Sequence, residues 1–184
     1  LDELNEVLKN FSYRILKQDC LDLPEKVYVR RNIQLTEDQK NIYENLKKWA
    51  VASLEEGDIT TVNVITQLLR LQQVTCGYAK LDDGSFKELN NNRINELLSV
   101  LDEVSGKAII WANYIYDIRK ICEALNKQYG KESYGAYYGE VSDEDRQKLV
   151  MNFQSRNNPC RFFVGQVRTG GYGLTLTAAN TVIY

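Results

Sequence analysis

The sequence predicts an α/β fold in which a doubly wound, mainly parallel sheet carries helices on both faces, with a helical insertion before it. Two observations predict this class. Short apolar runs at residues 107–112, 134–138 and 161–164 have the length of strands, and the first of them is apolar enough to be buried on both faces. Segments of roughly ten to fifteen residues with helical spacing separate these runs, which favours parallel pairing through right-handed crossovers.

The first 34 residues form a segment of their own. Apolar residues between Leu4 and Ile15 follow a helical spacing, and the alternation after Pro24 predicts a strand over residues 25–29. We assign residues 1–34 to a connecting segment that leads into the rest of the chain.

Residues 35–92 are predicted to form the helical insertion. Thr36 and Gln39 have the spacing of a capping box, and the helix that they begin is expected to run to Gly57. A second helix is expected from about residue 61 to 74. The apolar stripe that includes Trp49 is predicted to pack between these helices, with docking of another protein as the alternative. Turn-forming residues between 77 and 92 place the boundary of the insertion there.

Residues 93–184 supply the α/β domain. Apolar faces over residues 94–104 and 118–125 predict two helices, and Ser142 with Asp145 predicts the cap of a third. The last four residues begin another strand. Because the sequence stops there, we expect the natural protein to continue beyond this point.

Composition excludes several classes of chemistry. The sequence has no histidine, which removes imidazole bases, Ser-His and Cys-His nucleophile pairs and histidine-containing metal sites. The four cysteines form no Cys-x-x-Cys pair, so we expect reduced core thiols in an intracellular protein. No apolar run approaches the roughly 20 residues of a membrane span, and the first residues lack the pattern of a signal peptide, so we expect a soluble protein.

Charge is distributed unevenly along the chain. The net charge of −2 argues against indiscriminate binding to polyanions. The segment from residue 146 to 184, however, contains no acid and five cations: Arg146, Lys148, Arg156, Arg161 and Arg168. Both a local basic surface and a solvated helix face are compatible with this pattern.

The segment after the third predicted strand is the richest candidate site. Gly170, Gly171 and Gly173 would let backbone amides approach a ligand closely, and the nearby Arg168 could pair with a phosphate. A dinucleotide fingerprint fails because Leu176 occupies its third glycine position, and no Gly-Lys-Ser/Thr of a Walker A motif is present. A tight turn without a ligand is the alternative.

Six segments, taken in order, resemble a known family. They are residues 20–26 (CLDLPEK), 35–43 (LTEDQKNIY), 69–76 (LRLQQVTC), 107–114 (KAIIWANY), 138–146 (YGEVSDEDR) and 167–179 (VRTGGYGLTLTAA). This order is similar to that of the Swi/Snf family of helicase-like ATPases that translocate on double-stranded DNA, and specifically to their second, C-terminal RecA-like lobe. The fourth and sixth segments stand where motifs IV and V stand in the family.

The resemblance implies a two-lobe motor with ATP in the cleft between the lobes. It makes residues 1–34 the linker from the first lobe, 35–92 an insertion typical of the family, and 93–184 a RecA-like lobe that is incomplete at its C-terminal end. Motif VI and its arginines would lie beyond the sequence, and the first lobe would hold most of the ATP and the Mg²⁺ ion. The 184 residues alone are therefore expected to be catalytically incompetent.

Specific residues follow from the same resemblance. The nucleotide would contact Gly171, Gly173, Leu174 and Thr175. DNA would contact Asn113, Tyr114, Arg146, Arg168, Thr169 and Gly170. No catalytic residue and no metal ligand are expected within this sequence. Val167 and Thr175 replace side chains usual in motif V, and Glu140 would repel a phosphate nearby unless it points away.

Several of these residues have structural alternatives. Arg168 could pair with a carboxylate, and Arg146 could make an ordinary salt bridge within a helix. The tyrosines at 134, 137 and 138 could stack on bases, but packing in the sheet core is favoured for at least one of them.

The expected partners are double-stranded DNA and the first lobe of the same polypeptide, with the isolated piece monomeric and no membrane involved. Lys40, Lys47 and Lys48 of the insertion could help to hold DNA or a regulator. The modest acidity favours a cytoplasmic protein of bacterial or phage origin. The alternative function is a non-motor α/β module that binds a phosphorylated ligand or serves as a scaffold.

Overall fold

The computed structural model describes residues 2–9, 11–13, 15–16, 20, 22, 25–55, 61–81 and 83–184. The chain divides into two compact units, Leu1–Asn32 and Ile33–Tyr184, and each is described by itself. The predicted helix end at Gly57 lies outside the described residues. Among those that are described, no helix is both long and apolar enough to span a bilayer.

In the first unit, the structure gives the bounds of the helix α1 (Asp2–Lys9). It ends earlier than the apolar spacing predicted, with the Leu8 carbonyl accepting hydrogen bonds from the amides of Phe11 and Ser12. The strand predicted over residues 25–29 is wrong. These residues adopt no regular structure, and the Tyr28 side chain is 88% exposed. The alternation of apolar and polar residues was insufficient to predict a strand, because no neighbouring strand pairs with this backbone in the described part of the chain.

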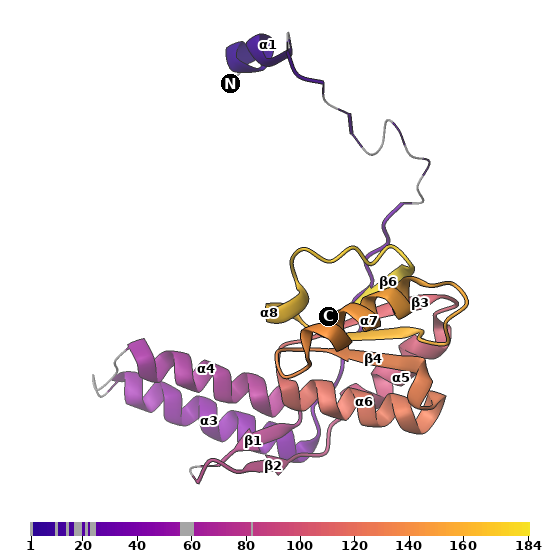
Figure 1. Ribbon diagram of the computed structural model, residues 1–184. Coiled ribbons are helices and arrows are strands. Elements are labelled where there is room, and N and C mark those ends of the chain that lie inside the picture. The colour runs from indigo at the N-terminus through magenta and orange to yellow at the C-terminus, as the bar shows by residue number, and fades with distance from the viewer. Residues whose placement is uncertain are drawn as a thin grey trace. The chain divides into compact units, whose positions relative to one another are not determined.

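The second unit begins with two helices that lie side by side, α3 (Glu37–Glu55) and α4 (Thr61–Thr75) (Figure 1). The predicted capping box is confirmed, since the Thr36 amide donates to Gln39 Oε1 at 3.1 Å and the Gln39 amide donates to Thr36 Oγ1 at 3.3 Å. Gln39 is buried, and its Nε2 also donates to the Val74 carbonyl at 2.8 Å. One side chain therefore both begins α3 and fastens it to α4.

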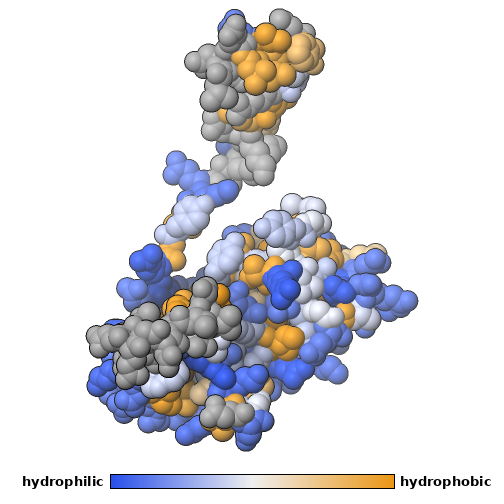
Figure 2. Space-filling model, turned by 90° about the vertical axis from the view of Figure 1, so that its left-hand side faces the viewer, coloured by the Kyte–Doolittle hydropathy of each residue, from blue (hydrophilic) through white to orange (hydrophobic). Residues whose placement is uncertain are grey.

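The predicted packing of Trp49 between the two helices is wrong. Ile42 and Leu46 are half-buried, but Trp49 is 62% exposed. The α4 residues Ile65 and Leu68 are exposed as well. Figure 2 looks toward the end of this helix pair. Among the residues that it colours, most are hydrophilic, with separate apolar patches between them.

A short antiparallel hairpin follows α4, where the sequence indicated only turns. Its strands are β1 (Tyr78–Lys80) and β2 (Phe86–Glu88). The turn is closed by Asp83 Oδ1, which accepts hydrogen bonds from the amide and the hydroxyl of Ser85 at 2.8 and 2.6 Å. Three-residue strands are too short for alternation to be recognised, whereas the turn residues are visible in the sequence.

The predicted parallel sheet is confirmed. Its strands are β3 (Lys107–Ala112), β4 (Tyr134–Tyr137), β5 (Phe162–Gln166) and β6 (Ala179–Ile183). They pair in the order β4-β5-β3-β6, and every pair is parallel. The connecting segments are α5 (Arg93–Glu103), α6 (Ile115–Tyr129), the 3₁₀ turn η1 (Lys131–Ser133), α7 (Asp143–Gln154) and α8 (Val167–Gly170).

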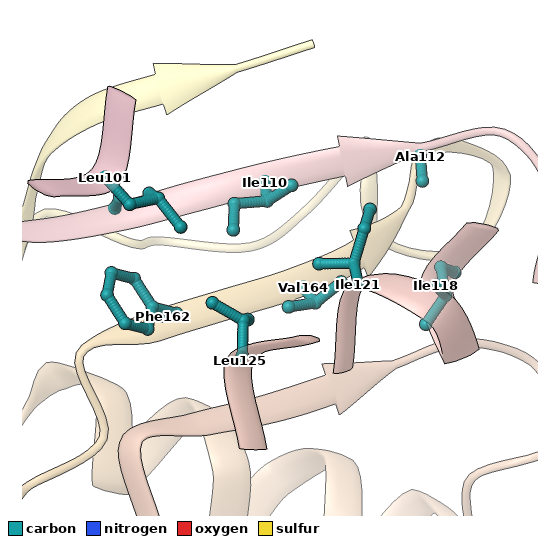
Figure 3. Packing of buried hydrophobic residues seen from close by; sticks show 9 residues of the cluster. Leu101, Ile110, Ala112, Ile118, Ile121, Leu125, Phe162 and Val164 are labelled. Carbon is teal, nitrogen blue, oxygen red and sulfur yellow. The ribbon is translucent and has the colours of Figure 1, made fainter. Parts of the chain in front are cut away.

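Helices cover both faces of the sheet, as predicted. On one face, Ile110, Phe162 and Val164 pack against residues of α5 and α6 (Figure 3). On the other face, Ile109 and Phe163 pack against α7 and against the segment that precedes β6. The alternation of strand side chains between the two faces explains why consecutive residues of β3 and β5 are both buried.

Two cations stabilise the ends of helices inside the domain. Lys107 Nζ donates to the carbonyls of Phe153 and Ser155, both at 2.8 Å, at the C-terminal end of α7. Arg161 donates to the Leu101 carbonyl at 3.1 Å, in the last turn of α5, and to the Gly106 carbonyl at 3.0 Å, which follows α5. Both cations therefore lie at C-terminal helix ends, where positive charge is favourable. Arg161 is therefore a structural residue and not part of a basic surface.

Gly165 provides a test of the sheet packing. A Cβ atom there would lie 2.4 Å from Trp111 Cζ3 and 3.0 Å from Phe163 Cε1, and neither ring can move without disturbing the core. We expect Gly165→Ala to lower the free energy of unfolding by about 1–3 kcal/mol, measured by urea denaturation. The matched control is Gly139→Ala, where a Cβ would meet nothing within 4 Å, and a change below about 0.5 kcal/mol is expected. Equal losses for the two variants would contradict the packing described.

Candidate functional site

The carboxyl ends of the parallel strands meet along one edge of the sheet, where ligands bind in open α/β folds. Asn113 follows β3, Gly139 and Glu140 follow β4, and α8 follows β5 directly. Gln166 Nε2 donates to the Asn113 carbonyl at 3.3 Å, which joins two of these segments. We call residues 113–114, 138–140 and 166–175 the carboxyl edge.

The glycine segment begins as one helical turn and continues as an irregular loop. The Gly171 amide donates to the Val167 carbonyl at 2.9 Å and closes α8. Gly170 is buried, and a Cβ there would lie 3.0 Å from Tyr137 Cδ1. Gly173 has φ +77°, a conformation that strains other residues, and therefore redirects the chain. The glycines let the segment turn tightly against the sheet while its outer side stays open.

The predicted nucleotide-binding residues divide between surface and core. Gly171, Gly173 and Thr175 are exposed. Leu174 is half-buried and packs on the sheet face that α7 covers, so its side chain anchors the loop. Tyr172, between the two exposed glycines, is 95% exposed.

Arg168 is the exposed cation of the carboxyl edge. It lies on α8 and makes no ion pair with any described residue, so the predicted alternative of a carboxylate partner is not observed. Its neighbour Thr169 donates its hydroxyl to Gln166 Oε1 at 3.0 Å. The turn therefore presents a guanidinium to solvent from a backbone held at the sheet.

Arg146 is engaged within the domain. Its Nη2 lies 2.5 Å from Asp143 Oδ1, and its guanidinium lies over the ring of Tyr137 with 5.6 Å to the centroid. The salt bridge within α7, the predicted alternative, is thus present. The side chain is only 22% exposed, and its Nε is buried without a hydrogen-bond partner among the described residues. Arg146 lies over the Tyr137 ring, and the same ring leaves no room for a side chain at the buried Gly170.

Glu140 is held by a cation on α6. Arg119 Nη2 lies 2.9 Å from Glu140 Oε2, and this hydrogen bond is the main reason why the pKa of Arg119 is raised. Both side chains are more than half exposed, so the pair adds little stability. It does neutralise the carboxylate that would otherwise oppose a phosphate at this edge.

Tyr114 connects the carboxyl edge to the helical insertion. Its hydroxyl donates to Gln72 Oε1 on α4 at 2.8 Å, and its ring meets that of Tyr78 edge-on at 5.9 Å. Asp117 and Cys76 lie in the same contact region. We call Gln72, Cys76, Tyr78, Tyr114 and Asp117 the joint.

Burial raises the pKa of each acidic group of the joint. It raises the pKa of the Cys76 thiol to about 11, and the nearby Asp117 carboxylate raises it further. Burial likewise raises the pKa of the Asp117 carboxyl and of the Tyr78 and Tyr114 hydroxyls. Removal from water disfavours the charged form of each group.

The tyrosines around β4 belong to the core. Tyr134 and Tyr138 pack against the cluster beneath α6, and the Tyr137 ring lies 5.4 Å from that of Phe163. Packing in the sheet core, the favoured alternative for these tyrosines, is confirmed. Among the residues that the structure describes, no cluster of three or more Cys, Asp or Glu could hold a metal ion.

Gln72, Gln166 and Tyr172 were not singled out from the sequence. Glutamine carries no motif of its own, and only the structure shows what the two amides join. A signal for Tyr172 was present, because the glycines on both sides of it leave few neighbours that could bury a ring.

Comparison with known proteins identifies the chain. Residues 90–184 match the family described as the helicase conserved C-terminal domain. The chain belongs to that family. Within it, the chain is a Swi/Snf-type C-terminal lobe of helicase superfamily 2, as the six sequence segments indicated.

Relatives of this helicase lobe match nearly its whole length. It is 27% identical over 196 residues to YwqA of Bacillus subtilis, whose name describes an ATP-dependent helicase/translocase, and the match covers 100% of the chain and 21% of YwqA. The Sulfolobus solfataricus SWI2/SNF2 ATPase core domain is similar with a TM-score of 0.70 and 27% identity, covering 100% of the chain and 39% of that structure.

A related structure, the same Sulfolobus core in complex with double-stranded DNA, is similar in fold with a TM-score of 0.66 and 24% identity. That match covers 98% of the chain and 40% of that structure. The chain spans about a fifth of the length of the curated relatives that it matches.

Thiol reactivity tests the joint. At pH 8 a thiol with a pKa of about 11 is ionised to about one part in a thousand, so iodoacetamide is expected to modify the exposed Cys20 and to leave Cys76 unmodified. Modification of Cys76 should accelerate as the pH rises toward 11, and unfolding in urea should expose all four thiols. Mass spectrometry of tryptic peptides measures each site. Equal rates for Cys76 and Cys20 at pH 8 would contradict a closed joint.

Proposed function

We propose that this chain is the second motor lobe of an ATP-dependent translocase of double-stranded DNA. The observation that carries the proposal is the exposed Arg168, which makes no ion pair with any described residue, on a glycine-lined turn at the carboxyl edge. A guanidinium presented from a backbone fixed at the sheet can pair with a phosphate, and phosphate contacts suit a motor that moves along DNA without reading its sequence. The double-stranded DNA in the related Sulfolobus structure supports the choice of partner.

The residues proposed to contact DNA follow from this geometry. Arg168 and Thr169 would meet the backbone of the duplex through α8, and Asn113 lies exposed beside them. Gly170 would contribute by letting α8 lie close to the sheet. Arg146 and Tyr114 are engaged within the domain, so we assign them to support of the DNA face.

The exposed backbone of the glycine loop is proposed to face ATP. Gly171, Gly173 and Thr175 leave backbone groups open on the outer side, while Leu174 anchors the loop. ATP supplies the energy of translocation when it is bound between the lobes. We propose that the first lobe holds the Mg²⁺ ion and most of the nucleotide, and the naming of relatives as ATP-dependent helicases supports the use of ATP.

We propose the division of the chain into a linker (1–34), an insertion (35–92) and a RecA-like lobe (93–184) as its functional organisation. The insertion would extend the DNA-binding face through Lys47 and Lys48, which are exposed. Lys40 pairs with Glu37 at 2.7 Å and is the weaker candidate. Bacterial relatives support a cytoplasmic protein of bacterial or phage origin.

Substitution of Arg168 tests the DNA face. In the complete protein, Arg168→Ala is expected to lower DNA-stimulated ATP hydrolysis about tenfold and to reduce the salt dependence of DNA binding by about one phosphate contact. Both follow from the loss of one guanidinium at the duplex. ATPase titrations with DNA at several salt concentrations measure them.

The matched control for Arg168 is Arg156→Ala. Arg156 is also exposed but precedes β5, at the opposite end of the strand. This variant should retain the stimulation and the salt slope of the unmodified protein. If Arg168→Ala behaved like the control, the carboxyl edge would not be the DNA face.

The isolated 184-residue chain is expected to have negligible ATPase activity with Mg²⁺ and DNA. Most of the groups that would bind and activate ATP are proposed to lie elsewhere in the protein, and one wall of a cleft positions a reacting phosphate poorly. Phosphate release measures this directly. Robust hydrolysis that copurifies with the chain through successive columns would contradict the proposal that the first lobe supplies most of the ATP-binding groups.

A further inference from the structure

A series of hydrogen bonds runs from the helical insertion to the glycine segment. Gln72 Oε1 on α4 accepts from the Tyr114 hydroxyl at 2.8 Å. The adjacent Asn113 carbonyl accepts from Gln166 Nε2 at 3.3 Å, and Gln166 Oε1 accepts from the Thr169 hydroxyl at 3.0 Å. The two glutamine side chains therefore join three segments that are far apart in the sequence.

We infer that Gln166 is a positioning residue that fixes α8 and its Arg168, and that Gln72 extends this control to the helical insertion through Tyr114. The inference rests on the proposed function, because it concerns how the DNA-facing turn is held. Gln166 itself would touch neither DNA nor nucleotide. It acts through the placement of the turn that follows it.

The need for such a residue follows from the length of α8. Four residues make only one turn, which is not stable by itself because the first turn of a helix fixes several residues for a single hydrogen bond. Gln166 occupies the N-cap position but makes no side-chain cap bond to the turn's amides. Its side chain instead ties the turn sideways, with the carbonyl oxygen toward Thr169 and the amide nitrogen toward the end of β3.

Gln166 is itself well fixed. It is the last residue of β5, and it pairs in register with Ala112, the last residue of β3. The preceding Gly165 is buried against Trp111. A side chain that leaves a paired strand end can hold the following turn because its own backbone is fixed by the sheet.

The helical insertion is connected to the carboxyl edge through the joint. Tyr114 packs edge-on against Tyr78, and Tyr78 lies 4.4 Å from the ring of Tyr116 on α6. A change in the position of α4 would therefore move Tyr114 and, with it, the adjoining carbonyl that Gln166 holds. By this route a regulator or a DNA segment bound to the insertion would alter the DNA-facing turn.

A double-mutant cycle in the complete protein tests whether Gln166 acts through Arg168. Gln166→Ala is expected to raise the DNA concentration for half-maximal ATPase about fivefold, since it removes two neutral hydrogen bonds that hold the turn. The KM for ATP should change less than twofold. Combined with Arg168→Ala, Gln166→Ala should add nothing further, because its effect passes through the placement of Arg168. The matched control is Gln128→Ala, which loses the hydrogen bonds from α6 to Asp102 on α5 and should leave the DNA dependence unchanged.

A second double-mutant cycle, with Gln72→Ala and Tyr114→Phe, tests the hydrogen bond between the helical insertion and the carboxyl edge. Each removes one partner of the same hydrogen bond and keeps the ring packing of Tyr114, so each alone and both together should raise the half-maximal DNA concentration by the same factor of about three to five. An effect of Tyr114→Phe without one of Gln72→Ala would show that the hydroxyl contacts DNA directly and would overturn the extension to the insertion.

The outcomes separate this inference from the proposed function. If Arg168→Ala itself has no effect, the DNA face lies elsewhere and the proposed function fails. If Arg168→Ala weakens the DNA dependence but Gln166→Ala does not, or if the two losses add while the melting temperature falls, Gln166 has no positioning role. Gln166→Glu keeps the acceptor for Thr169 but lacks the donor to Asn113. If this variant had the same half-maximal DNA concentration as the unmodified protein, the inference that both hydrogen bonds are needed would be overturned.

Discussion

The parallel register of β3 with β5 is the constraint on which the rest of the domain depends. It places Ala112 beside Gln166, so that the two strands end together and their following residues meet at one edge. The same register buries both faces of the sheet, since neighbouring residues of each strand face α6 and α7 in turn. A slip by one residue would reverse every side chain and would separate Asn113 from the glycine segment.

The helical insertion is attached where that edge begins. Aromatic rings, the Gln72–Tyr114 hydrogen bond and the ion pair of Lys120 with Glu88 at 3.0 Å fasten it to α6. This attachment is adjacent to the residues that we propose to face DNA. Under the proposed function, the insertion is therefore placed to influence DNA binding.

Much of this organisation was predictable from sequence. The strands at 107–112 and 134–138, the caps at Thr36 and Ser142, and the order of motifs all carry local signals that the structure confirms. The hairpin of β1 and β2 was missed because its strands are too short to show a period, and the strand expected at 25–29 is wrong because alternation does not supply a partner.

The site was harder to read than the fold. Glycines and an arginine could be recognised as a candidate loop, and a salt bridge of Arg146 within its helix was one of the predicted alternatives, but the position of its guanidinium over the Tyr137 ring depends on how α7 packs against β4. The same holds for Gln166, whose two partners lie 53 and 3 residues away in the sequence. The hydrogen-bond partners of a side-chain amide can be identified only when the positions of the surrounding backbone groups are known.

Under the proposed function, the internal use of Arg161 has a consequence for how firmly the lobe would hold a duplex. Five cations lie between residues 146 and 184, yet Arg161 binds carbonyls within the domain and Arg146 is paired. In the part of the chain that the structure describes, Arg168 alone of these five lies at the carboxyl edge. Each phosphate neutralised strengthens attachment and slows release. Under the proposed function, a lobe with one such contact in this segment would have a short dwell time on each phosphate, as a motor that detaches and rebinds at every step requires.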